Sequence, residues 1–154
     1  MVNSISDSVQ ILSQYWKEQG IMKTVSDIKK IEDSEKLNGF TLPSDFKEFY
    51  SLINGMEGLY PNEIDKNGFL FYPIEAVVPV AVECPNSKME NINRIFLFSE
   101  YLQVRWWYGG DVIANDNYSI GIIADRDSFK PICNSLVRFL ELYMSDDPIL
   151  YNYK

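Results

Sequence analysis

Carboxylates that stand close together in the sequence are the first candidates for chemistry. Two neighbouring acids can transfer protons to and from a substrate or hold Mg²⁺ between them. Three such pairs occur in the chain: Asp125 with Asp127, Asp146 with Asp147, and Glu63 with Asp65. Acidic side chains in such positions are far more often turn residues or helix caps, so we interpret all three pairs as structural.

The residue types that many other catalytic sites need are missing from the sequence. The chain contains no histidine, which excludes Ser-His-Asp and Cys-His nucleophiles and histidine-bound zinc. The run from Asp111 to Asn117 superficially suggests a calcium loop but lacks the Asp-x-Asp-x-Asp-Gly spacing and the distal glutamate. No glycine-rich phosphate-binding motif occurs. We therefore predict that the protein is not an enzyme and uses no metal or cofactor. An apolar pocket for a small ligand stays open as an alternative.

The charge of the chain indicates the kind of partner it can bind. The 154 residues include 14 basic and 22 acidic side chains, which gives a net charge of −8. A nucleic-acid-binding protein needs a basic face to neutralise phosphates, so we expect no nucleic acid to bind. An acidic protein is better suited to a basic protein partner.

Composition also predicts where the protein works and how it is organised. No apolar run approaches the roughly 18 residues of a membrane helix, and the first residues lack the pattern of a signal peptide. Cys84 and Cys133 stand far apart and form no disulfide framework. The chain has no internal repeat, low-complexity tract or charged arm. We expect residues 1–154 to form a single cytoplasmic domain with no membrane contact.

A run of aromatic residues is the best candidate for a binding surface. Trp106, Trp107 and Tyr108 are consecutive, and side chains along a strand alternate between its faces, so at least one should point away from the helices. The alternative is that another layer, such as the tail 149–153, covers that outer face. Together with the acids expected nearby, the predicted partner-binding residues are Glu57, Glu63, Asp65, Glu100, Trp106, Trp107, Tyr108, Asp111 and Asp116.

The elements that position these residues begin with helices in the first third of the chain. Apolar residues recur there at spacings of three and four. Glycines that tolerate a left-handed backbone follow each apolar run and can end it. The predicted helices and the residues that end them are 5–16 with Gly20, 24–37 with Asn38-Gly39, and 43–53 with Asn54-Gly55. Thr24 is the expected cap of the second helix, and Leu37 is placed on its apolar side.

The rest of the chain predicts a sheet followed by a helix. Short runs rich in β-branched and aromatic residues indicate strands at 69–72, 94–98, 103–108, 111–114 and 118–124. Gly109-Gly110 and residues 115–117 are expected to be hairpin turns, and 73–79 one helical turn between prolines. A last helix is predicted from Ser128 to Tyr143, with Cys133 on its buried side. The expected fold is α+β, with the N-terminal helices and the C-terminal helix on one face of a mostly antiparallel sheet.

One segment of this pattern resembles a known family. The residues that carry the resemblance are Ile31-Glu32, Leu37, Phe40-x-Leu42-Pro43-x-x-Phe46-Lys47-x-Phe49-Tyr50 and Asn54-Gly55. This arrangement is similar to the hallmark of the Smi/Knr family, also called the SUKH superfamily. The match is close over residues 28–55 and weaker over 119–144, and in the family a Ser-Phe pair introduces the last helix. Here that pair is Ser128-Phe129. The motif residues themselves set a helix entry, bury its face and stop it, so we assign them structural roles.

The resemblance implies a protein partner. Many bacterial members act as immunity proteins that bind a cognate toxin domain, often a nuclease, in polymorphic or contact-dependent toxin systems. Fungal relatives are associated with regulation of cell-wall synthesis. We therefore expect an immunity protein whose partner is a basic toxin domain, with carboxylates that take the place of nucleic-acid phosphates. A non-catalytic scaffold or regulatory module is the alternative.

Overall fold

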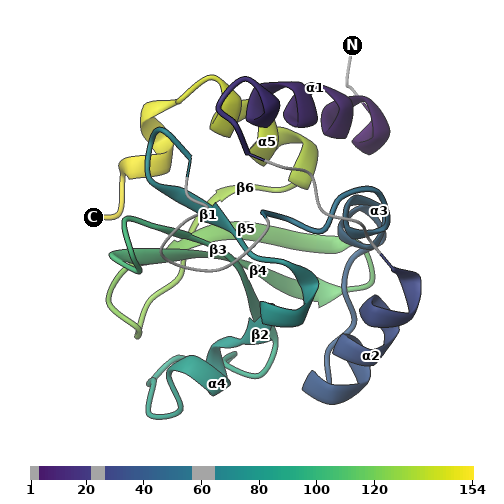
Figure 1. Ribbon diagram of the computed structural model, residues 1–154. Helices are drawn as coiled ribbons and strands as arrows, with labels where there is room; N and C mark the ends of the chain where they lie inside the picture. The colour runs from purple at the N-terminus through teal and green to yellow at the C-terminus, as the bar shows by residue number, and fades with distance from the viewer. Residues whose placement is uncertain (1–3, 22–26, 57–64) are drawn as a thin grey trace.

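The helices and the sheet form layers in a computed structural model that describes residues 4–21, 27–56 and 65–154. Figure 1 shows helices α1 and α5 side by side over the sheet, with α3 next to them. The sheet follows the order β1-β3-β4-β5-β6, β2 also pairs with β3, and every strand pair among the described residues is antiparallel. This arrangement confirms the predicted α+β class.

The elements have the following bounds. The α-helices are α1 (Ile5–Lys17), α2 (Ile28–Asn38), α3 (Ser44–Leu52), α4 (Val80–Glu83) and α5 (Leu136–Met144). Two short 3-10 helices are η1 (Ile74–Ala76) and η2 (Pro148–Tyr151). The strands are β1 (Phe69–Phe71), β2 (Val78–Pro79), β3 (Ile95–Tyr101), β4 (Trp106–Ala114), β5 (Asn117–Ile123) and β6 (Lys130–Cys133).

Helices α1 and α3 form where the apolar spacing predicts them. The Ser4 hydroxyl accepts the Asp7 N–H at 3.1 Å and so caps α1. Helix α3 begins directly after Pro43, as predicted, because a proline at the start of a helix lacks only an N–H that no helical carbonyl would accept. Most apolar residues of both helices are buried, and these are Ile5, Val9, Leu12, Trp16, Phe46, Phe49 and Tyr50.

Helix α2 differs from its prediction at the start and on one face. The expected cap, Thr24, lies outside the described residues, and the helix begins at Ile28 with the Asp27 carboxylate accepting the Lys29 N–H at 2.9 Å. Leu37 is 86% exposed, so its placement on the apolar side is wrong. It lies about a third of a turn around the helix from the buried Ile31. The helix ends at Gly39, whose φ of 70° confirms the predicted left-handed stop.

Strand β4 runs straight through Gly109 and Gly110, so the hairpin turn predicted there is wrong. Both glycines pair with β3 on one side and β5 on the other. A Cβ atom at Gly110 would lie 2.5 Å from the ring of Phe96. These glycines therefore permit close packing inside the sheet and do not reverse the chain.

The turn between β3 and β4 lies earlier, where a strand was predicted. Leu102, Gln103 and Val104 have φ values of 48°, 55° and 64°, which are uncommon for residues with a side chain. The Arg105 N–H donates to the Tyr101 carbonyl at 2.8 Å and closes this turn. Residues such as the β-branched Val104 rarely adopt this conformation, so the sequence did not indicate a turn here.

The last helix is shorter than predicted, and the segment before it is a strand. Lys130–Cys133 forms β6 and pairs with β5, and helix α5 starts at Leu136 with the Ser135 hydroxyl as its cap. The placements of Ser128-Phe129 at the helix start and of Cys133 on its buried side are therefore wrong. Pro131 opposes a helix at this point, because it lacks an N–H and pushes its predecessor toward an extended backbone.

The two faces of the sheet bury different residues. In β3, Phe96 and Phe98 pack under the helices, whereas Ile95 and Leu97 point to the opposite face. On that opposite face a smaller cluster forms with Val80 and Cys84 at α4, and partly buried Met89 and Ile92 pack against it. The segment from 80 to 92 therefore supplies a cover that the sequence analysis did not anticipate.

Candidate partner-binding site

The three consecutive aromatics of β4 are all buried. Trp106 and Tyr108 lie on the helical face, where the Tyr108 hydroxyl donates to the Leu150 carbonyl at 2.6 Å. Trp106 packs against the rings of Tyr101 and Tyr153. The C-terminal tail thus covers this face, not the outer one for which we considered it.

Trp107 points to the outer face, as the alternation of a strand requires, but it is also covered. Its side chain belongs to the cluster with Val80 and Ile123, and its indole N–H donates to the Tyr72 hydroxyl at 3.2 Å. The Tyr72 hydroxyl in turn donates to the carboxylate of Glu100 at 2.8 Å, and Glu100 is half-buried. Burial, with the Glu100 charge beside it, raises the pKa of Tyr72. The expectation of an exposed aromatic surface on β4 is wrong, and the alternative of a covering layer holds.

Asp65 is a structural residue. Its carboxylate accepts the N–H groups of Asn67 and Phe69, each at 2.8 Å, and the hydroxyl of Tyr143. Only 5% of it is exposed, so it offers no surface for a partner. Glu57 and Glu63 lie outside the described residues.

The two remaining acids lie on the β4–β5 hairpin. Asp111 accepts two hydrogen bonds from the Arg94 guanidinium, at 2.6 and 3.1 Å. Asp116 is exposed and accepts the backbone N–H of Ser44 at 2.7 Å, which caps helix α3 from a distant part of the chain. That hydrogen bond lowers the pKa of Asp116, and the nearby Lys47 lowers it further.

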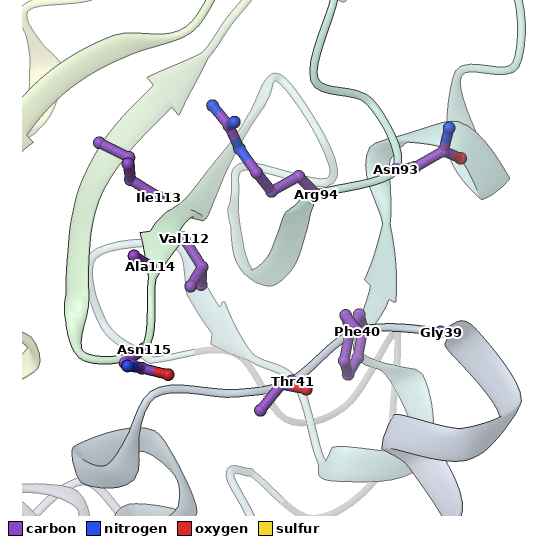
Figure 2. A pocket seen from close by; sticks show the side chains of 9 residues that line it. All are labelled: Gly39, Phe40, Thr41, Asn93, Arg94, Val112, Ile113, Ala114 and Asn115. Carbon is purple, nitrogen blue, oxygen red and sulfur yellow. The ribbon is translucent and has the colours of Figure 1, made fainter.

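A groove of about 460 Å³ opens beside this hairpin. The end of β4, the loop from α2 to α3, and the residues that precede β3 form its walls. Figure 2 shows Ile113 and Arg94 at one end of the groove, with Thr41 and Asn115 at the other. Its lining residues are Gly39, Phe40, Thr41, Asn93, Arg94, Val112, Ile113, Ala114 and Asn115.

The groove presents an exposed apolar side chain, and the exposed acid Asp116 follows its lining residue Asn115 in the sequence. Ile113 is 59% exposed, whereas Phe40 is buried in the wall. Around the groove, Arg94 is paired with Asp111, and Lys47 pairs with Glu35 at 3.5 Å.

The hydrogen-bond donors to Asp116 are the backbone N–H and the side chain of Ser44, both neutral. Lys47 is near enough to lower the pKa of Asp116 but forms its ion pair with Glu35, so the exposed Asp116 carboxylate can still pair with a basic group from outside.

Comparison with known protein families identifies the family to which this fold belongs. Residues 24–142 match the family described as SMI1 / KNR4 family (SUKH-1). The chain belongs to the SMI1 / KNR4 family. This match confirms the resemblance seen at the Leu42-Pro43 step, and it contains every residue that lines the groove. No curated protein matches the sequence.

The carboxylate pairs of this SMI1 / KNR4 chain that the structure describes sit in turns. Asp125 accepts the Asp127 N–H at 3.0 Å and the Ser128 hydroxyl at 2.7 Å, and Asp147 caps η2. Within the described part of the chain, no three His, Cys, Asp or Glu side chains gather into a possible metal site.

The thiols of the SMI1 / KNR4 chain are both free. Cys84 is buried and Cys133 half-buried, and desolvation raises the pKa of Cys133 to about 11. A thiol with so high a pKa is a poor nucleophile near neutrality, because the thiolate is the reactive form. Among residues 4–21, 27–56 and 65–154, no helix has the length and apolarity to cross a membrane.

Several residues of the groove were absent from the predicted set. Ile113, Phe40 and Arg94 come from three segments that lie far apart in the sequence. Ile113 carried a usable signal, since it is the last large apolar residue before the Asn115-Asp116 turn and lies at the end of a strand. Phe40 and Arg94 carried none, because only the fold brings them together.

Proposed function

We propose that this SMI1 / KNR4 family protein is an immunity protein that binds a cognate toxin domain and neutralises it by occupancy. The observation that carries the proposal is the groove beside the β4–β5 hairpin, where exposed Ile113 precedes the exposed acid Asp116 by three residues. An exposed large apolar side chain beside a charge is a common feature of protein interfaces.

The charge of the chain supports a basic partner. A nuclease toxin has a basic substrate groove, and a protein with net charge −8 is attracted to it over long distances. Within the predicted set, the accessible carboxylates of the described residues are Asp116, Asp111 and the half-buried Glu100. We infer that Asp116 contributes most, because Asp111 is already neutralised by Arg94. Glu57 and Glu63 stay predicted partner-binding residues.

Inhibition by occupancy needs no catalytic group in the immunity protein. The inhibitor only has to hold the toxin with an off-rate slow enough to keep its active site closed. The protein would work in the cytoplasm, where a delivered toxin meets its target. A scaffold or regulatory module of the cell-wall type would bind a cellular protein instead, and the partner it captures distinguishes the two functions.

Co-expression with a candidate toxin tests the proposal. The toxin domain to use is the C-terminal domain of a large secreted protein encoded beside the gene for this chain. We expect growth to be restored and the two proteins to copurify. Continued growth arrest, with no complex in the pull-down, would contradict the immunity function for that pair.

The salt dependence of binding tests the electrostatic part separately. If acidic residues steer the encounter, the association rate falls as ionic strength rises, while the dissociation rate changes little. An association rate that is the same at low and high salt would rule out steering by charge.

A further inference from the structure

Strand β4 extends beyond its neighbour β3 at the groove. The register between them ends at the pair Ile95–Asp111, although β4 continues to Ala114. On its other side β4 stays paired with β5, through Val112 with Tyr118 and Ala114 with Asn117. Among the described residues, the stretch Val112–Ala114 therefore has a strand on one side only.

The chain turns away before it could fill that position. The N–H groups of Arg94 and Ile95 both donate to the Asn91 carbonyl, at 2.9 and 3.0 Å, so the backbone enters β3 from a tight turn. The groove occupies the place where β3 would have continued along β4, with the loop at Phe40 and Thr41 as its far wall. Neighbouring strands of a sheet lie about 4.8 Å apart, so an added strand would lie at that distance from β4.

The chemistry of the walls defines what fits there. Phe40, Val112 and exposed Ile113 favour an apolar side chain. The nearby cations are already paired within the protein, Arg94 with Asp111 and Lys47 with Glu35.

The exposed acid beside these walls is Asp116, whose hydrogen-bond donors are the neutral N–H and side chain of Ser44. Charge complementarity therefore calls for a basic side chain close to an apolar one.

We propose that an extended segment of the toxin domain adds to the sheet beside Val112–Ala114 as a short strand. The segment carries an apolar residue that packs on Ile113 and a Lys or Arg that pairs with Asp116. Recognition by strand addition takes its affinity from main-chain hydrogen bonds and its specificity from alternate side chains. This inference rests on the proposed function, because it names the part of the toxin that binds.

Two groove variants and one matched control test the inference. The probe is the purified toxin domain encoded beside this gene, carrying an inactivating substitution, and the measurement is its Kd. Ile113→Glu places a charge on the apolar wall and should raise Kd at least about tenfold. Asp116→Asn keeps an oxygen to cap α3 but removes the charge, and it should raise Kd about two- to fivefold.

Ile11→Glu is the control, because Ile11 is 50% exposed on α1, away from the groove. It should leave Kd unchanged, and all three variants should keep the far-UV circular dichroism of the wild type.

Hydrogen exchange then locates the contact. We expect the amides of residues 112–114 to exchange more slowly in the complex than in the free protein. If the wild type binds the toxin domain but Ile113→Glu binds equally well, or exchange slows only elsewhere, strand addition is overturned while the immunity function stands. If the wild type does not bind at all, the proposed function fails and this inference with it.

Discussion

The Asp116 carboxylate in the β4–β5 turn accepts the backbone N–H of Ser44 at the start of helix α3, at 2.7 Å. The two residues are 72 positions apart in the sequence. Pro43, which precedes the helix, has no side chain that can cap it, so the hairpin supplies the acceptor that the helix start lacks. One contact thus joins the Leu42-Pro43 step of the family to the groove.

Replacing Asp116 separates its capping role from its charge. Asp116→Ala removes the acceptor and should lower the Tm, whereas Asp116→Asn retains a side-chain oxygen and should stay closer to the wild type. Thermal unfolding followed by circular dichroism measures both. Equal Tm values for the alanine variant and the wild type would show that the cap adds nothing to stability.

The same carboxylate predicts a dependence on acid pH. Its pKa is lower in the folded protein than the ordinary aspartate value of 3.8, so it contributes stability above that pH and loses it as the pH falls through the lowered folded value. The difference in Tm between the wild type and Asp116→Ala should therefore shrink below about pH 3.8. A difference that stays constant from pH 6 to about pH 2.5 would contradict the lowered pKa.

Gly110→Ala tests the close packing of the sheet centre. The added Cβ would meet the ring of Phe96 at 2.5 Å, so the variant should be destabilised by about 1–3 kcal/mol. Urea unfolding measures this loss. Were Gly110 in a turn, as the sequence alone suggested, an alanine there would have no ring to displace, and an unchanged free energy of unfolding would support that interpretation.

The strained turn between β3 and β4 gives the opposite prediction. Gln103 is exposed with a φ of 55°, a conformation that glycine adopts without steric cost. Gln103→Gly should therefore keep or raise the free energy of unfolding, by up to about 1 kcal/mol. The matched control is Gln14→Gly in the exposed part of α1, which should lose about 1 kcal/mol of stability because glycine disfavours a helix. A large loss at position 103 would argue against the left-handed turn.

The buried hydroxyl of Tyr143 in α5 links this helix to α1 and to the loop that precedes β1. It accepts the indole N–H of Trp16 at 2.9 Å and donates to the Asp65 carboxylate. Tyr143→Phe leaves the buried indole N–H of Trp16 without a partner and removes one of the hydrogen bonds to Asp65, so it should cost about 1–3 kcal/mol of unfolding free energy. Tyr15→Phe on the neighbouring ring, which is only partly buried, is the control and should cost less. An equal loss for the two variants would mean that the hydroxyl of Tyr143 has no special role.

The sequence predicted the elements whose local signals agree with the fold. Pro43 before an apolar helical face, and Gly39 after another, placed α3 and the end of α2 correctly. The prediction failed where long-range packing determines the backbone conformation. Gly110 reads locally as a turn residue, yet the ring of Phe96 requires a glycine inside a strand. Val104 reads as a strand residue, yet its φ of 64° places it in a left-handed turn.

The binding surface was predictable only in part, for the same reason. Asp111 and Asp116 were selected as acids expected near the aromatic run, and they are the sequence neighbours of the groove residues Val112 and Asn115. The aromatics of β4 were selected because interfaces favour such residues, but large aromatic side chains are equally favoured in cores. The cover over Trp107 comes from residues 80–92, which no pattern in β4 could reveal.

Neutralisation of a toxin by occupancy is the central claim, and a titration tests it most directly. The activity of the purified toxin domain is measured on its own substrate as this protein is added in increasing amounts, at fixed ionic strength. We predict that activity falls in proportion to the protein added and vanishes at an equimolar ratio. Full toxin activity in the presence of a large excess of correctly folded protein would contradict the account.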